Sequence, residues 1–491
     1  IADGETAAVE RELWPVSGGV VLPEGLLPVS TATGGSAVLT DTEGTEIPCQ
    51  TRVLAQGPAA TGGGPCVRRL LVTFVGRVAA GAEARYELRW SKDSPATPDE
   101  APQPGVSVVE LAGATVVRNG AGPGAMMLVV DGHRGCGLFE SVAIDEAGDG
   151  FTDDLPLIGD RRPVTSSVSY AGTRSHQAEL GFSVPEVVVE ESGPVRAVVR
   201  VRSEYDERVS MVHRLVVYAG LRAVFVQTTL YATPGRPQGE AIRVFGHTNV
   251  LPLGMLESPD VTFGACSADA PAETRTSVVP GQPLVIRSQQ GSTGFSATLG
   301  GDPLADVAAP LGWVEAACRG RRVALCLGSL PARPAQRVDV GGGYLVADSC
   351  ASELSLAPGQ SLTEEWLLYF PADLTALEPA DAARALADPL CPIAVAKGSE
   401  GLGGTRRPPD MTEPTLPTWG EAGYETRLER VLASAWHQAD EVVAGRGAAS
   451  SAEWVEALLW AFGQTGDPRW LGAARGLAIR LCDRPPPAGT G

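Results

Sequence analysis

A few strand-like segments carry the histidine, arginine and tyrosine side chains that could do chemistry in this chain. His213 and Arg214 lie inside residues 210–215. Alternation along a strand puts His213 on one face, and Arg214 with Tyr218 on the other. A guanidinium and a phenol on one face could bind the acidic and hydroxyl groups of a sugar. The alternative is a core histidine with a solvent-facing arginine.

A second constellation lies about thirty residues further on. Three polar residues in 243–249 have odd numbers: Arg243, His247 and Asn249. Side chains two residues apart point to the same side of a strand, so alternation predicts that these three share a face. Such a face could bind a carboxylate and its neighbouring hydroxyl groups. A polar outer face of a half-buried strand is the alternative explanation.

Three arginines at even spacing form a row on one predicted strand: Arg196, Arg200 and Arg202. The guanidinium fork matches carboxylate geometry, so the row could bind an anionic glycan. The other interpretation is an exposed face that is balanced by nearby acidic side chains.

Near the C-terminal end, Trp436 and His437 lie in a region dense in tryptophan. Aromatic faces can stack on pyranose rings, but they also fill the cores between helices through their large buried area. Trp436 and His437 are therefore candidates for sugar binding, with core packing as the alternative for the tryptophan.

Metal and cofactor chemistry has little support. The acidic group Asp145, Asp149, Asp153 and Asp154 could offer oxygen ligands to calcium, but its spacing is not that of an EF-hand, and an acidic surface loop explains it too. The nine cysteines show no CxxC spacing, so no zinc site is predicted. Cys49 and Cys66 could form a disulfide in an extracellular protein. We expect no nucleotide or redox cofactor.

Composition limits the class of partner. The 491 residues carry a net charge of −19, which argues against nucleic acid or anionic lipid as the main partner. No apolar run approaches the roughly 18 residues that span a bilayer.

The elements that position these residues are predicted to be mainly β. Short runs rich in Val and Leu, separated by Gly, Pro, Asp or Ser, extend from Trp14 to about Phe370, which is typical of sandwiches or barrels. The clearest predicted strands are 67–74, 83–90, 195–201, 210–218 and 223–230. Residues 95–105 contain four prolines and two acidic residues and read as a linker.

Beyond Pro371 the apolar period changes to 3.6. Residues 379–387 predict a short helix with proline at its first position. Residues 397–417 read as an extended linker. Amphipathic patterns and capping signals then predict three helices, at about 424–444, 451–462 and 468–483.

Several short motifs resemble the exo-rhamnogalacturonan lyase (YetA-like) family. They are GVVLPEGLL at 19–27, IPCQTRVLA at 47–55, RLLVTF at 69–74, YAG at 218–220 and GDPRWL at 466–471. The resemblance implies a RIFT-like barrel, a large β-sandwich and the first hairpins of an α/α toroid. Three helices are few for such a toroid, so we expect it to be incomplete in these 491 residues.

With this resemblance, the predicted organisation is a RIFT-like barrel (1–94), a linker (95–105), a large sandwich (106–372), a short helix and linker (373–417) and a helical segment (418–491). The implied activity is β-elimination at a uronic acid linkage of a polysaccharide. The expected location is extracellular, periplasmic or at the cell surface. The alternative is a non-catalytic surface, matrix or glycan-binding protein. We assign no catalytic base from the sequence.

Overall fold

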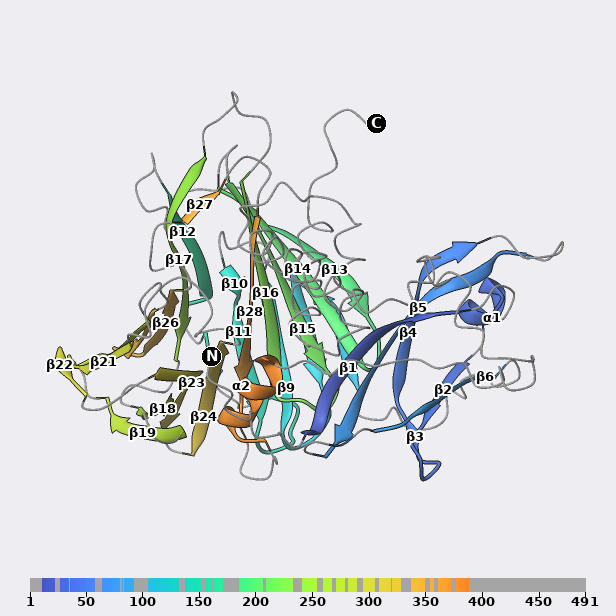
Figure 1. Cartoon of the computed structure of the whole chain (residues 1–491), viewed down its shortest axis with the longest axis horizontal. Coiled ribbons are helices and arrows are strands. Elements are labelled where there is room, and N and C mark those ends of the chain that lie inside the picture. The colour runs from blue at the N-terminus through green and yellow to red at the C-terminus, as the bar shows by residue number, and fades with distance from the viewer. Residues whose placement is uncertain are drawn as a thin grey trace, which may run out of the picture.

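The computed structural model of the chain is built mainly from antiparallel strands (Figure 1). The structure describes residues 11–22, 27–34, 36–57, 64–79, 82, 84–91, 105–131, 137–151, 156–159, 162–170, 185–205, 209–232, 241–253, 259–266, 271–278, 281–288, 295–304, 309–318, 320–327, 337–348, 354–356, 361–371 and 377–387. The fold class predicted from the sequence, mainly β with little helix, is confirmed in this part of the chain.

The N-terminal unit consists of two three-stranded sheets, ordered β1-β5-β4 and β3-β2-β6. Its elements are β1 (Arg11–Val21), α1 (Val29–Gly34), β2 (Ser36–Thr40), β3 (Glu46–Ile47), β4 (Cys49–Gly57), β5 (Cys66–Val78) and β6 (Glu87–Ser91). Val16, Leu39 and Leu70 are buried in one cluster that joins the two sheets.

A four-stranded sheet, ordered β11-β9-β8-β7, follows the N-terminal unit. Its strands are β7 (Val106–Leu111), β8 (Ala114–Asn119), β9 (Ala125–Asp131) and β11 (Ser141–Asp145). Val106 and Val117 of this sheet pack in the same core cluster as Ala197 and Val217 of the next strands.

One of two nine-stranded sheets, which we call the long sheet, is ordered β13-β14-β15-β16-β28-β24-β23-β18-β19. Its strands are β13 (Glu186–Ser192), β14 (Arg196–Glu204), β15 (Val209–Tyr218), β16 (Ala223–Ala232), β18 (Asp260–Cys266), β19 (Pro271–Ser277), β23 (Ala309–Cys318), β24 (Arg321–Leu327) and β28 (Ser361–Tyr369). The pairing of β16 with β28 joins residues that are far apart in the sequence.

A second large sheet, which we call the facing sheet, is ordered β10-β12-β17-β26-β25-β20-β21-β22, and β27 pairs with β17. Its strands are β10 (Gly137–Phe139), β12 (Val164–Tyr170), β17 (Ile242–Pro252), β20 (Leu284–Ser288), β21 (Phe295–Leu299), β22 (Asp302–Pro303), β25 (Arg337–Gly341), β26 (Tyr344–Asp348) and β27 (Leu354–Leu356).

Alternating burial explains why these segments pair as layers. In β15 every second residue, including Met211, His213 and Leu215, is buried, while Arg214 and Tyr218 on the other parity are half-buried. A strand with this pattern must cover its apolar face with another layer. The facing sheet supplies that layer.

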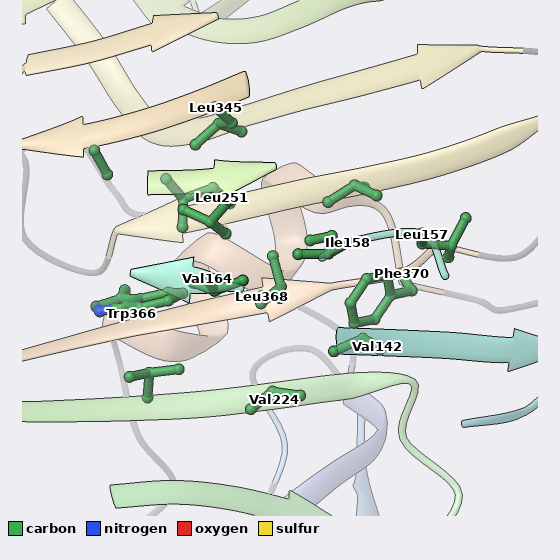
Figure 2. Packing of buried hydrophobic residues seen from close by; sticks show 14 of the residues in the cluster. Val142, Leu157, Ile158, Val164, Val224, Leu251, Leu345, Trp366, Leu368 and Phe370 are labelled. Carbon is green, nitrogen blue, oxygen red and sulfur yellow. The ribbon is translucent and has the colours of Figure 1, made fainter. Parts of the chain in front are cut away.

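The core lies between the long sheet and the facing sheet. Figure 2 shows Trp366 and Leu368 of β28 beside Val164 of β12, with Leu251 of β17 and Leu345 of β26 further into the facing layer. All five side chains are almost fully buried. The contacts join strands that come from distant parts of the sequence, so the sandwich is one cooperative core.

The outer face of the long sheet is partly covered by α2 (Pro379–Ala387) and by the N-terminal unit. In Figure 1, α2 lies beside β24 and β28, and it buries Ala382 and Ala385 in a cluster with Trp14 of β1. The Trp14 ring meets Phe225 of β16 edge to face at 5.7 Å. The strand predictions at 67–74, 195–201, 210–218 and 223–230 and the helix at 379–387 are therefore confirmed; the helices predicted beyond residue 418 lie outside the described residues.

One covalent prediction is wrong. Cys49 pairs with Phe74, and Cys66 pairs with Gly57, so the two thiols lie at opposite ends of the β4–β5 ladder. A disulfide needs Cα atoms within about 7 Å, and both cysteines are free. Among the described residues, no helix is long and apolar enough to cross a bilayer.

Candidate functional site

A buried polar cluster lies between the two large sheets, and we call it the interlayer cluster. Ser166 and His247 come from the facing sheet, on β12 and β17, while His213, Thr228 and Glu364 come from the long sheet. His213, Thr228 and Glu364 form one cross-strand row on β15, β16 and β28. Alternation turns this row inward, so polar side chains replace apolar ones at this level of the core.

Three of these residues form a hydrogen-bonded line from one sheet to the other. The Ser166 hydroxyl lies 3.0 Å from Nε2 of His247, and Nδ1 of His247 lies 3.0 Å from Oε2 of Glu364. Since Nδ1 faces a carboxylate, Nδ1 donates to Glu364, and Nε2 forms the second hydrogen bond with the Ser166 hydroxyl, which also lies 3.8 Å from Sδ of Met211. The backbone carbonyl of Ser166 accepts a bond from Tyr205 at 2.9 Å.

The order serine, histidine, carboxylate is the one that activates a nucleophile in acyl-transfer enzymes. Here the exposed fractions of Ser166, His247 and Glu364 are only 2%, 1% and 5%. A substrate cannot reach Oγ of Ser166 while the layers are packed. The chemistry available to this line is therefore the satisfaction and positioning of buried polar groups.

His213 is held on the same inner face. Its Nδ1 lies 2.9 Å from the Thr228 hydroxyl. Burial, and secondarily repulsion from the His247 imidazole whenever that ring is protonated, lowers the pKa of His213 to about 3. His213 is therefore neutral around pH 7, and the sequence alternative of a core histidine describes its position.

The shared face predicted for Arg243, His247 and Asn249 is wrong for Arg243. Gly246 lies opposite Ser169, but the next pair joins Val244 to Tyr170, so Phe245 is an extra residue in β17. This bulge changes the parity of the strand. As a result Arg243 and Phe245 point outward, whereas His247 and Asn249 point inward.

The outward side chains of the bulge lie on the outer face of the facing sheet. Phe245 is 44% exposed, and the Arg243 guanidinium lies 5.8 Å from the centroid of its ring. It is the one aromatic residue among the large hydrophobic side chains that are exposed in the described part of the chain. Figure 1 shows β17 with β12 and β27 beside it near one end of the sandwich.

Polar side chains continue across this face next to the bulge. Ser167, Thr248, Asp348 and Arg337 form a cross-strand row on β12, β17, β26 and β25, and all four are half-buried. Hydroxyl, carboxylate and guanidinium groups can donate to or accept from the hydroxyls of a sugar. An exposed ring beside such a row is the candidate binding surface.

Arg214 and Tyr218 lie elsewhere, on the outer face of the long sheet. Arg214 binds Glu190 through two bonds of 2.8 and 3.2 Å. The Tyr218 ring lies 5.3 Å from Phe225 and 5.8 Å below the guanidinium of Arg196. The arginines of this face are paired as the balanced-surface alternative expects, in the ion pairs Arg196–Glu191, Arg200–Glu186, Arg200–Glu190 and Arg202–Glu204.

The structure thus separates the four described residues of the predicted glycan site. Arg214 and Tyr218 lie on one outer face, Arg243 on the other, and His247 lies between the sheets. Trp436 and His437 fall outside the described residues.

Asp145, the first of the candidate calcium ligands, is buried and is used by its own loop. Its carboxylate accepts the backbone N–H groups of Gly148, Asp149 and Gly150 at 2.5 to 3.1 Å. In the described ranges no group of three or more His, Cys, Asp or Glu side chains could hold a metal ion. Asp153 and Asp154 lie outside those ranges.

Sequence reasoning did not find Ser166, Glu364 or Phe245. The signal for Phe245 was Gly246, because an isolated glycine in a strand pattern indicates a bulge. No comparable signal distinguishes Ser166 from Ser167, or Glu364 from Glu365, until the inner face of each strand is known.

No family model matches the chain, and no curated protein matches it. Solved structures match it weakly. A TPR-domain containing protein from Parabacteroides distasonis has a TM-score of 0.35 at 10% identity, over 74% of this chain and 57% of that one. A glycosyl hydrolase family 38 protein from Enterococcus faecalis has a TM-score of 0.33 at 12% identity, over 74% and 43%.

A galactose mutarotase related enzyme from Lactobacillus acidophilus has a TM-score of 0.29 at 10% identity, over 55% of this chain and all of that one. The chain spans 57% and 43% of the length of the first two structures. The last two are carbohydrate-active enzymes by name, but TM-scores of this size carry no argument about the fold or activity of this chain.

Proposed function

We propose that this chain is a glycan-binding β protein whose contact surface is the outer face of the facing sheet around Phe245. The observation that carries the proposal is the exposed Phe245 ring, placed outward by a bulge and flanked by Arg243. Burying an apolar ring that is exposed to water lowers the free energy. The C–H face of a pyranose ring can bury it by stacking on it.

Hydrogen bonds from the neighbouring polar row would orient a sugar that stacks on Phe245. Thr248 and Ser167 carry hydroxyl groups in this cross-strand row. Asp348 and Arg337, which already bind the His247 N–H and Asp339, carry further acceptor and donor atoms. Because these groups stand on paired strands, their spacing is fixed before a ligand arrives, which reduces the entropy lost on binding.

Affinity electrophoresis of the full chain against acidic and neutral polysaccharides tests the proposal. Full burial of a Phe side chain is worth about 1.5–3 kcal/mol, so Phe245→Ala is expected to weaken retention by roughly tenfold or more. Leu111→Ala is the matched control, because Leu111 is 51% exposed on β7, in a different sheet. Equal retention of wild type and Phe245→Ala on every glycan that binds would overturn the assignment.

The motif resemblance supports a second function, β-elimination at a uronic acid linkage. That reaction needs a base that reaches the proton α to a carboxylate. Within the described ranges the histidines are His213 and His247, and both are buried and hydrogen-bonded. We propose His437, which lies outside these ranges, as the first histidine candidate for the base.

Incubating the full chain with a panel of uronate polysaccharides tests this second function. Release of an unsaturated uronate product supports elimination, and loss of that product in His437→Gln would support His437 as the base. Retention of glycan without any product would instead support the non-catalytic alternative. A polysaccharide partner would suit the extracellular, periplasmic or cell-surface location that the resemblance implies.

A further inference from the structure

The bulge that presents Phe245 sits where β17 changes its partner. On one side β12 pairs with residues 244–250 of β17, across the bulge. On the other side β27 pairs with residues 242–244, and β26 pairs with residues 248–252. The β26 ladder ends at Thr248 and the β27 ladder ends at Val244, on either side of the bulge.

Side chains from three strands hold His247 next to the bulge. The backbone N–H of His247 donates to Oδ1 of Asp348 at 3.3 Å, and Asp348 is the last residue of β26. The imidazole of His247 is held at both nitrogens, by Ser166 of β12 and by Glu364 of the long sheet. His247 is thus fixed in three directions at the inward-facing residue next to the bulge.

We propose that Ser166, His247 and Glu364 are positioning residues, which hold the β17 bulge in place and so fix the outward orientation of Phe245 and Arg243. The effect of this positioning on glycan binding rests on the proposed function, whereas the positioning itself rests on the hydrogen bonds alone. Strand parity has period two, so a slip of one residue at His247 would exchange the inward and outward sets. A residue anchored in the core prevents that slip.

The contacts also explain why the anchor is polar. An apolar residue at position 247 could fill the core, but it would have no directional bond to the opposite sheet. The Nδ1 contact with Glu364 and the Nε2 contact with Ser166 each specify one ring orientation. Losing either partner removes one hydrogen bond of a buried nitrogen and so weakens the hold on β17.

Hydrogen exchange of the full chain, followed by mass spectrometry of peptides that cover residues 242–250, tests the inference directly. Loss of a buried hydrogen bond raises the population of the locally open, exchanging state by roughly tenfold or more. Ser166→Ala and Glu364→Ala are therefore expected to speed exchange at residues 243–247 by about this factor. Glu364→Gln retains an acceptor for Nδ1 of His247, so it is expected to restore most of the protection.

Thr228→Val is the matched control. It removes a buried hydroxyl on the same inner face, but that hydroxyl binds His213 rather than His247. Faster exchange at 243–247 in Ser166→Ala and Glu364→Ala but not in Thr228→Val supports the inference. Exchange that is unchanged in the first two variants, or equally raised in all three, overturns it.

Glycan retention by the same variants separates this inference from the proposed function. If wild type binds no glycan, the function fails, and the exchange result still decides whether the line positions the bulge. If Phe245→Ala loses retention while Ser166→Ala changes neither retention nor exchange, the function stands and the positioning role falls.

Discussion

His213 shows how a titratable side chain becomes a neutral part of the core. Its ring is packed beside Met211 and Leu215 on the inner parity of β15, and it keeps one bond to Thr228. Since burial lowers its pKa to about 3, the folded chain does not take up a proton there in mildly acidic solution. The unfolded chain, with an ordinary histidine pKa, does take it up.

This difference predicts a loss of stability as the pH falls from about 6.5 towards 3. In that window the unfolded state binds one more proton than the folded state, so the free energy of unfolding decreases with decreasing pH. At pH 5 the loss from His213 alone is about 2 kcal/mol. His213→Asn, whose amide can replace Nδ1, is expected to remove this contribution.

Urea unfolding of wild type and His213→Asn at pH 7.5 and at pH 5 measures the contribution as a double difference. Because the other acidic and histidine groups are common to both proteins, their titration cancels. An equal loss of stability in both proteins between the two pH values would show that His213 is protonated in the folded state.

For single residues, the inward or outward orientation in a regular strand was predictable from the sequence, and the position of the bulge was not. Alternation correctly separated His213 from Arg214, since β15 has no irregularity. The same rule failed at Arg243 and His247, because one inserted residue reverses it. Gly246 indicated a bulge, but the side on which Phe245 would emerge depends on the pairing with β12, which no local pattern encodes.

The segment before β12 has no room for a side chain at Gly159. Gly159 has φ +84°, and a Cβ there would lie 1.9 Å from the carbonyl oxygen of Glu140. Its N–H donates to the carbonyl of Pro252 at 3.0 Å, at the end of β17. The glycine thus allows this segment to pass between β17 and the chain before β11.

Gly159→Ala is expected to destabilise the fold by about 2–3 kcal/mol more than Gly44→Ala. Gly44 is a matched control because its φ is +83° with nothing within 4 Å of a Cβ. Both variants carry the left-handed strain, but only Gly159→Ala adds the clash. Denaturant midpoints measure the difference, and equal midpoints would contradict the close approach.

The positions of helices and strands in the sequence were more predictable than the pairing between strands. The sequence located α2, because a proline at its first position and acidic Asp381 in its first turn agree with the dipole and capping rules. Hairpin neighbours such as β14–β15 follow from chain order. The pairing of β16 with β28 does not, because it depends on which distant edge is free when the sheet closes.

On the scale of the whole molecule, Gln50 joins the N-terminal unit to the sandwich. Its Nε2 donates to Glu191 at 2.6 Å, and its Oε1 accepts the backbone N–H groups of Val195 and Arg196 at 3.3 and 3.0 Å. A Cβ on Gly193 would collide with this side chain. One amide thus contacts both the last strand residues of β13 and the turn that leads into β14.

Gln50→Ala is expected to weaken this junction by about 1–3 kcal/mol, because buried polar partners lose their bonds. Hydrogen exchange should then rise in β4 and β5 while β15 and β16 keep their protection. Gln227→Ala is the control, since Gln227 donates to Glu365 within the long sheet at 2.9 Å. Unchanged exchange in β4 and β5 would mean that Trp14 and its apolar neighbours carry the junction alone.

The sequence predicted an N-terminal β unit before a larger β region, but not how they touch. Nothing in the segment around Gln50 distinguishes it from Gln56, which lies on the same strand. The contact depends on the tilt between two folded bodies, so it is decided after each body has its own core.

The β16–β28 pair also has a consequence for synthesis on the ribosome. Tyr231 and its partner Ser361 lie about 130 residues apart in the chain. At roughly 5–20 residues per second, β28 is made about 7–26 s after β16. During that interval the edge of β16 that pairs with β28 lacks this partner, and an exposed strand edge can pair with other chains. We therefore expect slower translation between residues 232 and 361 to lower the yield of folded protein.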